Sequence, residues 1–236
     1  MRYSDNDAYI IQRGGRRQSR RSGAGRAAGV LIAVLIILTA AICLLVVFLP
    51  RFKSGNTTVS TAAVQGKTYY FLCTAQAEER TQGLVAAHNA MERGGAGYVY
   101  NNGKYTVVAA VYSRESDVKT LVTVNADCFY FSLSLPAGEY DDGDKKVIEY
   151  LSGEWFDTVA VAASELERGN ITESAAEYAV VQACKRLYGL ALGASSQKLK
   201  NALTAIEYSP PTTQTVLSYI RYINVAYIVS ACSALE

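Results

Sequence analysis

Few side chains in this sequence have the types and spacings that catalysis requires. The single histidine, His88, stands in a stretch whose apolar residues recur at helical spacing, so we predict a core position for it rather than a role as a general base. The chain contains no Cys-x-x-Cys pair, no Gly-x-Ser-x-Gly nucleophile motif and no phosphate-binding glycine loop. We therefore predict no enzyme activity, no bound metal and no cofactor.

Three acidic residues, Asp141, Asp142 and Asp144, stand close together after the middle of the chain. An EF-hand calcium loop needs oxygen ligands at fixed positions and a bidentate glutamate at its end. Neither that spacing nor the glutamate is present, so we interpret these acids as part of a solvated linker.

The stretch from Gly29 to Leu49 contains no charged residue, and at about 1.5 Å of rise per residue a helix of this length crosses the roughly 30 Å hydrocarbon core of a bilayer. Seven arginines precede it, whereas only Arg51 and Lys53 follow closely. This asymmetry places the N-terminus in the cytoplasm. We predict a single-pass protein of the cell membrane whose C-terminal part is extracytoplasmic. A cleaved signal peptide is the alternative, although its apolar core is usually shorter.

Charge limits the choice of partner. Residues 1–28 form a basic cytoplasmic arm, and the chain after them is net acidic. We interpret the arm as a topology signal that could also contact anionic lipid headgroups. An acidic outer part argues against nucleic acid as a partner. Residues 50–66 are rich in Ser, Thr, Gly and Ala, which predicts a short tether.

Residues 67–136 switch repeatedly between strand and helix patterns. The aromatic and aliphatic run TYYFLCTA predicts a strand, and the turn at Asn101-Asn102-Gly103 predicts a hairpin. The full set of expected elements is a strand over 68–75, a helix over 77–93 with Leu84, Ala87, His88 and Met91 on its apolar stripe, strands over 98–100 and 105–112, a helix over 116–124 and a strand over 127–135. This order closes as one antiparallel sheet with both helices on one face, the ferredoxin-like arrangement. The other face would then meet solvent or a ligand.

Residues 137–236 have helical periodicity throughout. We expect one helix over 145–167 interrupted at Gly153, a second capped by Asn170, a third opened by Ser195 or Ser196, and a fourth over 216–235. Short loops between these helices favour a small bundle. The fourth helix is unusually apolar, so it is either a buried central helix, which we favour, or a second membrane span.

The stretch 67–136 resembles a SPOR domain, the sporulation-related module of bacterial envelope and cell-division proteins. The resemblance is carried by the strand YYFLCTA, the helix ending in Gly-Gly, and the turn into NNGKYTVVAAV. It implies an α+β protein in which a transmembrane helix precedes a ferredoxin-like SPOR-like domain and a small helical bundle. It also implies binding to peptidoglycan glycan strands that lack stem peptides. The Gln and Ser that are usual in the family's first strand are absent, and the third strand is more apolar than the family's.

Alternation along the strands indicates which side chains would contact the glycan. We assign one side of the first and third strands to the helix-free face, which gives the candidate contact residues Tyr70, Leu72, Gln76, Thr106, Val108 and Tyr112. On this hypothesis Tyr70 and Tyr112 stack on sugar rings and Gln76 hydrogen-bonds their hydroxyls. Alternatively, this face packs on the C-terminal part of the chain.

Cysteines are informative only if the chain is exported, because thiols then can oxidise. Cys43 falls within the apolar stretch. Some SPOR domains carry a cysteine pair near the positions of Cys73 and Cys128, and the two would lie on neighbouring strands. The resemblance thus predicts a Cys73–Cys128 disulfide, with two buried thiols as the alternative. We expect Cys184 and Cys232 to be core residues rather than a second pair.

Two functions remain open from the sequence. The first is a membrane-anchored, non-enzymatic envelope protein that binds glycan strands during cell division or sporulation. The second is an interaction scaffold that has lost glycan binding and docks on other membrane proteins through its helical part. A hydrolase is a distant third, because no paired carboxylates form a recognisable motif.

Overall fold

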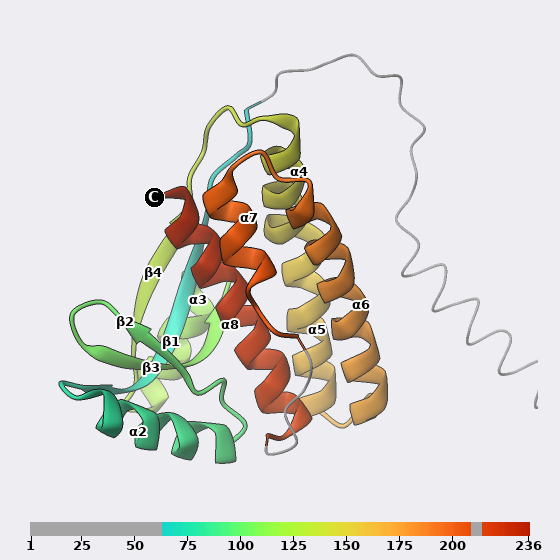
Figure 1. Cartoon of the computed structure of the whole chain (residues 1–236). Coiled ribbons are helices and arrows are strands. Elements are labelled where there is room, and N and C mark those ends of the chain that lie inside the picture. Colours follow the sequence, from blue (N-terminus) through green and yellow to red (C-terminus); the bar gives the residue numbers. More distant parts are fainter. Residues whose placement is uncertain (1–62, 209–213) are drawn as a thin grey trace, which may run out of the picture. The chain divides into compact units, whose positions relative to one another are not determined.

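A four-stranded antiparallel sheet organises the described part of the chain (Figure 1). The computed structural model describes residues 63–208 and 214–236. The predicted membrane segment, its basic arm and Cys43 therefore lie outside the described residues. The strands run in the spatial order β2-β3-β1-β4, and every pairing is antiparallel. Their bounds are Lys67–Ala77 for β1, Tyr98–Asn101 for β2, Tyr105–Tyr112 for β3 and Phe129–Leu135 for β4.

The β2–β3 hairpin forms where its turn residues predict it. Gly103 has a φ of 98°, a conformation that only glycine adopts readily, and its N–H donates to Asn101 Oδ1 at 3.1 Å. Aromatic side chains then hold the strands together. The ring of Phe71 stacks on that of Phe131 at 5.0 Å between centroids, and Tyr100 stacks on Phe131 at 5.1 Å.

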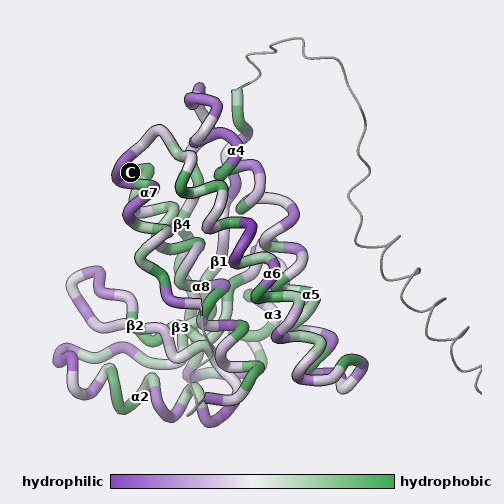
Figure 2. The backbone as a smooth tube through the Cα atoms, turned by 45° about the vertical axis from the view of Figure 1, so that its right-hand side comes forward, coloured by the Kyte–Doolittle hydropathy of each residue, from purple (hydrophilic) through white to green (hydrophobic). Residues whose placement is uncertain are grey.

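Helices α2 (Arg80–Glu92) and α3 (Glu115–Val124) cover one face of the sheet, which we call the α3 face. The apolar stripe expected on α2 is right at Ala87, which is buried, but wrong at Leu84 and His88. Leu84 is 51% exposed, and His88 is exposed beside Glu92 with 3.5 Å between Nε2 and Oε1. The buried stripe consists instead of the small residues Gly83, Ala87 and Ala90, and Figure 2 shows α2 alternating between hydrophobic and hydrophilic segments.

Small residues are buried on α2 because the helix lies very close to the sheet. A Cβ added at Gly83 would come within 2.9 Å of Tyr105 Cβ. Such close packing excludes a leucine stripe, so large apolar residues are displaced to the solvent side of α2.

Helix α8 (Val216–Leu235) covers the opposite face, which we call the α8 face (Figure 1). It contacts β2, β3 and β4 on one side and other helices on its far side. The remaining helical segments are α4 (Asp142–Tyr150), the π-helical turn η1 (Leu151–Trp155), α5 (Phe156–Glu167), α6 (Glu173–Leu192) and α7 (Gln197–Thr204). One apolar core runs continuously from Phe71 on β1 to Leu187 on α6.

The expected fold class is therefore wrong in its arrangement. It placed a sheet domain with one open face before a separate helical bundle. The described residues instead form one compact unit, and the C-terminal helices share their core with the sheet. The alternative given from the sequence, in which the helix-free face packs on the C-terminal part of the chain, is the one that the structure shows. Within the described residues one helix, α8, is long and apolar enough to cross a membrane, and 67% of its most apolar window is buried.

The junction that follows the sheet is structured rather than solvated. Asp144 is only 7% exposed, and its carboxylate accepts the N–H of Ser196 at 2.9 Å. Gly143 lies against the backbone of Gly193, where a Cβ would come within 2.3 Å of the carbonyl oxygen. The linker interpretation is thus wrong for Asp144, which joins the start of α4 to the start of α7, whereas Asp141 and Asp142 are exposed to solvent.

Helix ends follow the predicted chemistry in part. The hydroxyl of Ser196 accepts the N–H of Leu199 at 3.3 Å, as expected for the start of α7. The cap of α6 is Thr172 rather than Asn170, whose amide donates to Glu165 at 2.8 Å. At Gly153 the chain is not interrupted but passes through η1, where the Ser152 carbonyl accepts a hydrogen bond from Lys67.

Candidate functional site

The candidate glycan-contact residues do not share one surface. Leu72 lies opposite Tyr130, whose hydroxyl donates to Glu115 of α3 at 2.8 Å. Tyr70 and Tyr112 lie opposite each other, and the ring of Tyr70 is 6.3 Å from that of Tyr130. These three candidates, Tyr70, Leu72 and Tyr112, therefore lie on the α3 face.

The other three candidates lie on the α8 face. Val108 is fully buried in the core shared with α8. Thr106 is 1% exposed and lies opposite Tyr100, which packs on the same core. Gln76 lies opposite Thr106 and donates from Nε2 to its Oγ1 at 3.3 Å. Of these three residues only Gln76 is exposed to solvent.

Two irregularities in the β1–β3 pairing place the six candidate glycan-contact residues on two different faces of the sheet. The register steps from Leu72–Ala110 to Cys73–Val108 and then to Ala75–Val107. Ala109 and Thr74 are therefore left without an opposite residue, and each such bulge reverses the alternation of side chains. The sequence argument assumed unbroken alternation, so it placed residues from two faces on one.

The expected Cys73–Cys128 disulfide is not formed, and all four described cysteines are free thiols. Cys73 lies opposite Phe129 on β4, one residue beyond Cys128. Cys128 instead belongs to a turn in which its N–H donates to the Asn125 carbonyl at 2.9 Å. Burial raises the pKa of the Cys73 thiol to about 12, with a smaller contribution from nearby Cys128.

Cys184 and Cys232 also remain thiols in the core. Burial raises the pKa of each to about 12. Thiols held in this way are neutral at physiological pH, which makes them poor nucleophiles. Their predicted role as core residues agrees with this placement.

A cavity of about 240 Å³ lies between the end of β3, α5 and α8. We call it the β3–α5–α8 cavity. Its apolar wall comes from α5, with Val159, Ala160 and Ala163, and its polar lining includes Tyr112, Asp117, Ser164, Glu167, Arg221 and Asn224. It is smaller than the roughly 300–1,000 Å³ of typical drug-sized sites, so its size suits one side chain or a small polar molecule.

Arg221 fixes the geometry of the cavity rim. Its Nη1 donates to the carbonyl of Gly94 at 2.8 Å, and its Nη2 lies 2.8 Å from Glu167 Oε2. The arginine side chain is only 19% exposed. Charge-assisted hydrogen bonds of this kind are stronger than neutral ones, so Arg221 ties α8 to α5 and to the turn after α2.

Asn224 is the unusual member of the cavity lining. It is 5% exposed, and its Oδ1 has no hydrogen-bond partner within the described part of the chain. Two other buried polar atoms without partners there, Trp155 Nε1 and Tyr227 Oη, do not line the cavity. An unsatisfied buried carbonyl is costly, so the amide of Asn224 is the group in the cavity lining that most lacks a hydrogen-bond partner.

The charges around the cavity are already paired. Asp117 Oδ2 lies 3.0 Å from Arg114 Nη2, and Glu167 is paired with Arg221. Burial raises the pKa of Tyr112, an effect that Arg221 opposes and that Glu167 and Asp117 reinforce. The phenol is thus a neutral hydrogen-bonding group at physiological pH. Together these features favour a neutral polar ligand over an ion.

The polar groups of the cavity are arranged for hydrogen bonding. Its lining contains neither histidine nor cysteine, and the carboxylates of Asp117 and Glu167 are each paired with an arginine. No cluster of metal-ligating side chains occurs among residues 63–208 and 214–236.

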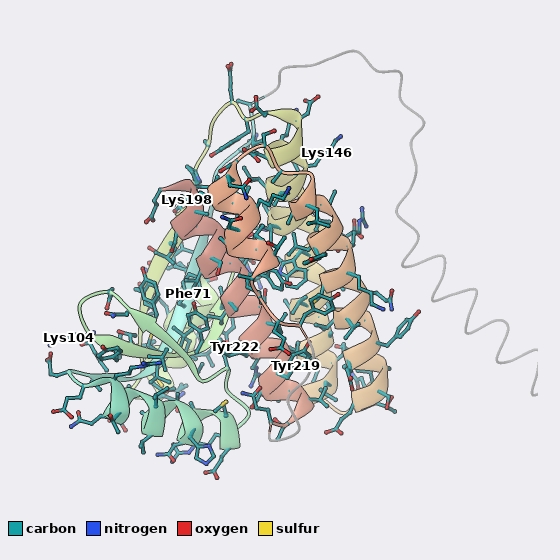
Figure 3. All side chains as sticks on the ribbon, viewed as in Figure 1. Phe71, Lys104, Lys146, Lys198, Tyr219 and Tyr222 are labelled. Atoms are coloured by element: carbon teal, nitrogen blue, oxygen red, sulfur yellow. The ribbon has the colours of Figure 1, made fainter. Side chains whose placement is uncertain are left out.

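A second, more open groove of about 380 Å³ runs between β2 and α7–α8, with Tyr98, Tyr100 and Lys198 in its lining; Figure 3 labels Lys198.

No protein-family model, no curated protein and no solved structure matches this chain. The resemblance to SPOR domains therefore stays a prediction from the residues that carry it.

Proposed function

We propose that this chain is a non-enzymatic interaction protein that docks on a partner protein, and that its sheet does not bind glycan strands. The observation that carries the proposal is that the chain's own helices cover both faces of the sheet. Glycan stacking needs an exposed face with aromatic rings on it, and here the two proposed stacking residues, Tyr70 and Tyr112, lie on the face that α2 and α3 cover. Figure 3 shows Tyr222 of α8 pointing toward the strands, and its ring is 5.6 Å from that of Tyr98.

The β3–α5–α8 cavity is the site that we assign to docking. A partner would insert a neutral polar side chain that hydrogen-bonds the amide of Asn224, while the alanines of α5 contact its apolar part. Membrane attachment through residues 29–49 remains a prediction from the sequence. If it holds, the partner is another membrane protein with an extracytoplasmic part.

The glycan alternative can be tested directly. Full-length protein in detergent would be sedimented with amidase-treated peptidoglycan sacculi, with a known SPOR domain as the positive control. We expect no retention. Retention that is lost in a Tyr70→Ala/Tyr112→Ala variant would overturn the proposal, because it would place a working glycan site on the sheet.

The docking site needs its own test. A photo-crosslinking amino acid at Ser164, on the cavity rim, should give a defined adduct in cells, whereas the same group at Val161 on the exposed side of α5 should not. Adding Asn224→Leu should suppress the Ser164 adduct, because it removes the amide from the cavity lining without unfolding the protein. An adduct that persists in the Asn224→Leu background would show that the cavity is not the docking site.

A further inference from the structure

The outer edge of β4 is open in the described part of the chain. β4 pairs with β1 alone, and Figure 1 shows it at one margin of the sheet. A strand in this position presents a row of backbone N–H and C=O groups that can pair with another strand.

Natural proteins usually protect such an edge with charge, proline, a bulge or short length. β4 has none of these devices. Its seven residues, FYFSLSL, include no charged residue and no proline. Its pairing with β1 runs without a register shift from Lys67–Leu135 to Cys73–Phe129. The opposite edge differs, because β2 is only four residues long.

The side chains of β4 are sorted by face. Phe129, Phe131 and Leu133 point to the α8 face and remain only partly buried against the core. Ser132 and Ser134 are exposed on the α3 face, where Ser134 Oγ lies 2.8 Å from Thr68 Oγ1. The partly exposed aromatic rings at the edge could be covered further by a neighbouring strand.

We infer that β4 pairs with β4 of a second copy of this chain, antiparallel and centred on Ser132. In this register Phe131 lies opposite the partner's Leu133, and Phe129 lies opposite the partner's Leu135. Apolar side chains then face apolar ones on the α8 face, and polar or hydroxyl side chains meet on the other.

A second copy fits this edge better than an unrelated strand because the two-fold operation makes β4 complementary to itself. With no charge along the strand, no like charges meet anywhere in the pairing. The product is a continuous eight-stranded antiparallel sheet, formed from two copies of the observed four-stranded one. This inference is independent of the cavity and of what docks there.

Sedimentation velocity of the full-length chain in density-matched detergent tests the inference. We expect a concentration-dependent monomer–dimer equilibrium. Ser132→Lys should weaken the dimer by about tenfold or more, because it places two lysines opposite each other at the two-fold axis. The matched control, Ser132→Thr, keeps the strand uncharged and should remain dimeric.

Hydrogen exchange distinguishes the remaining outcomes. The outward backbone amides of β4 should be slower to exchange at high protein concentration than at low concentration, and this difference should vanish in Ser132→Lys. A wild-type chain that stays monomeric at every concentration would overturn the inference. So would a Ser132→Lys variant that dimerises as the wild type does, or β4 amides that are equally protected in the monomer.

Discussion

At the scale of single residues, the buried amide of Asn224 is the feature that most needs an explanation. It stands in the middle of α8 among apolar neighbours, and its Oδ1 has no partner in the described chain. A buried carbonyl without a hydrogen bond usually costs about 1–3 kcal/mol. Of the three buried polar side-chain atoms without a partner in the described chain, only the one on Asn224 belongs to a residue that lines the cavity, which is why we connect it with binding.

Replacing Asn224 should therefore make the isolated protein more stable. We expect Asn224→Leu to raise the free energy of unfolding by about 1 kcal/mol, because the branched side-chain shape is kept and an unsatisfied carbonyl is removed. Urea denaturation of both proteins measures this difference. A fall in stability of similar size would mean that the amide already has a partner in the free protein.

Ser218, on the same helix, provides a control whose substitution should change stability in the opposite direction. It is fully buried, and its hydroxyl donates to the carbonyl of Met91 at 2.6 Å. Ser218→Ala should lower stability by about 1 kcal/mol, because it removes one of the two hydrogen bonds that the Met91 carbonyl accepts; the other comes from the Gly94 N–H at 2.9 Å.

The cysteines should differ sharply in reactivity. Cys73, Cys184 and Cys232 are buried with pKa values raised to about 12, whereas Cys128 is partly exposed. Iodoacetamide at mildly alkaline pH should thus modify Cys128 first, and peptide mass spectrometry would show its adduct while the other three remain unmodified. A Cys73–Cys128 disulfide in exported protein would leave Cys128 unreactive and contradict this expectation.

These buried thiols also set the sign of an alkaline pH dependence. Their folded pKa lies above the ordinary value of 9.0. Their contribution to stability is complete below that value and is lost as the pH rises toward 12. The free energy of unfolding should accordingly decline across that interval rather than rise.

At the scale of elements, the surroundings of a helical glycine decide whether its replacement by alanine raises or lowers stability. Gly189 is exposed on α6, and a Cβ there would meet nothing within 4 Å. Gly83 on α2 lies against Tyr105. We expect Gly189→Ala to raise stability by about 1 kcal/mol through helix propensity.

The same substitution at Gly83 should lower stability by about 1–3 kcal/mol, because it overpacks the contact with β3. Thermal melts of the two variants compare the effects directly. Equal changes at both sites would show that α2 does not lie as close to the sheet as the structure places it.

The sequence patterns predicted most of the helices and strands, but not which faces of them pack together. The order of strands and helices in residues 67–136, the Gly103 turn and the Ser196 cap depend on local residue types, which can be identified directly in the sequence. The glycan face could not be predicted, because the unpaired Thr74 and Ala109 are determined by strand pairing rather than by residue type. The buried stripe of α2 was missed for a related reason, since alanine and glycine carry little hydrophobic signal. Asn224 gave no signal beyond being polar in an apolar helix.

At the scale of the whole molecule, α8 makes the sheet and the helices depend on each other. It contacts three strands as well as α5, α6 and α7. Each of the two stretches, 67–136 and 137–236, buries an apolar surface of the other. A division of the folded part into two independent domains would leave the apolar surface of α8 or of the sheet exposed to water.

The two stretches should therefore unfold together. The only tryptophan, Trp155, lies in η1 and reports on the helices, whereas the Cys73 thiol lies on β1 and reports on the sheet. In a urea titration, tryptophan fluorescence and Cys73 modification should give coincident transitions, as two-state unfolding requires. Cys128 and the other thiols would be distinguished by peptide mass spectrometry of the modified chain. If the sheet thiol became reactive at a clearly lower urea concentration than the tryptophan transition, the stretches would be separate domains and α8 would contribute little to holding the sheet.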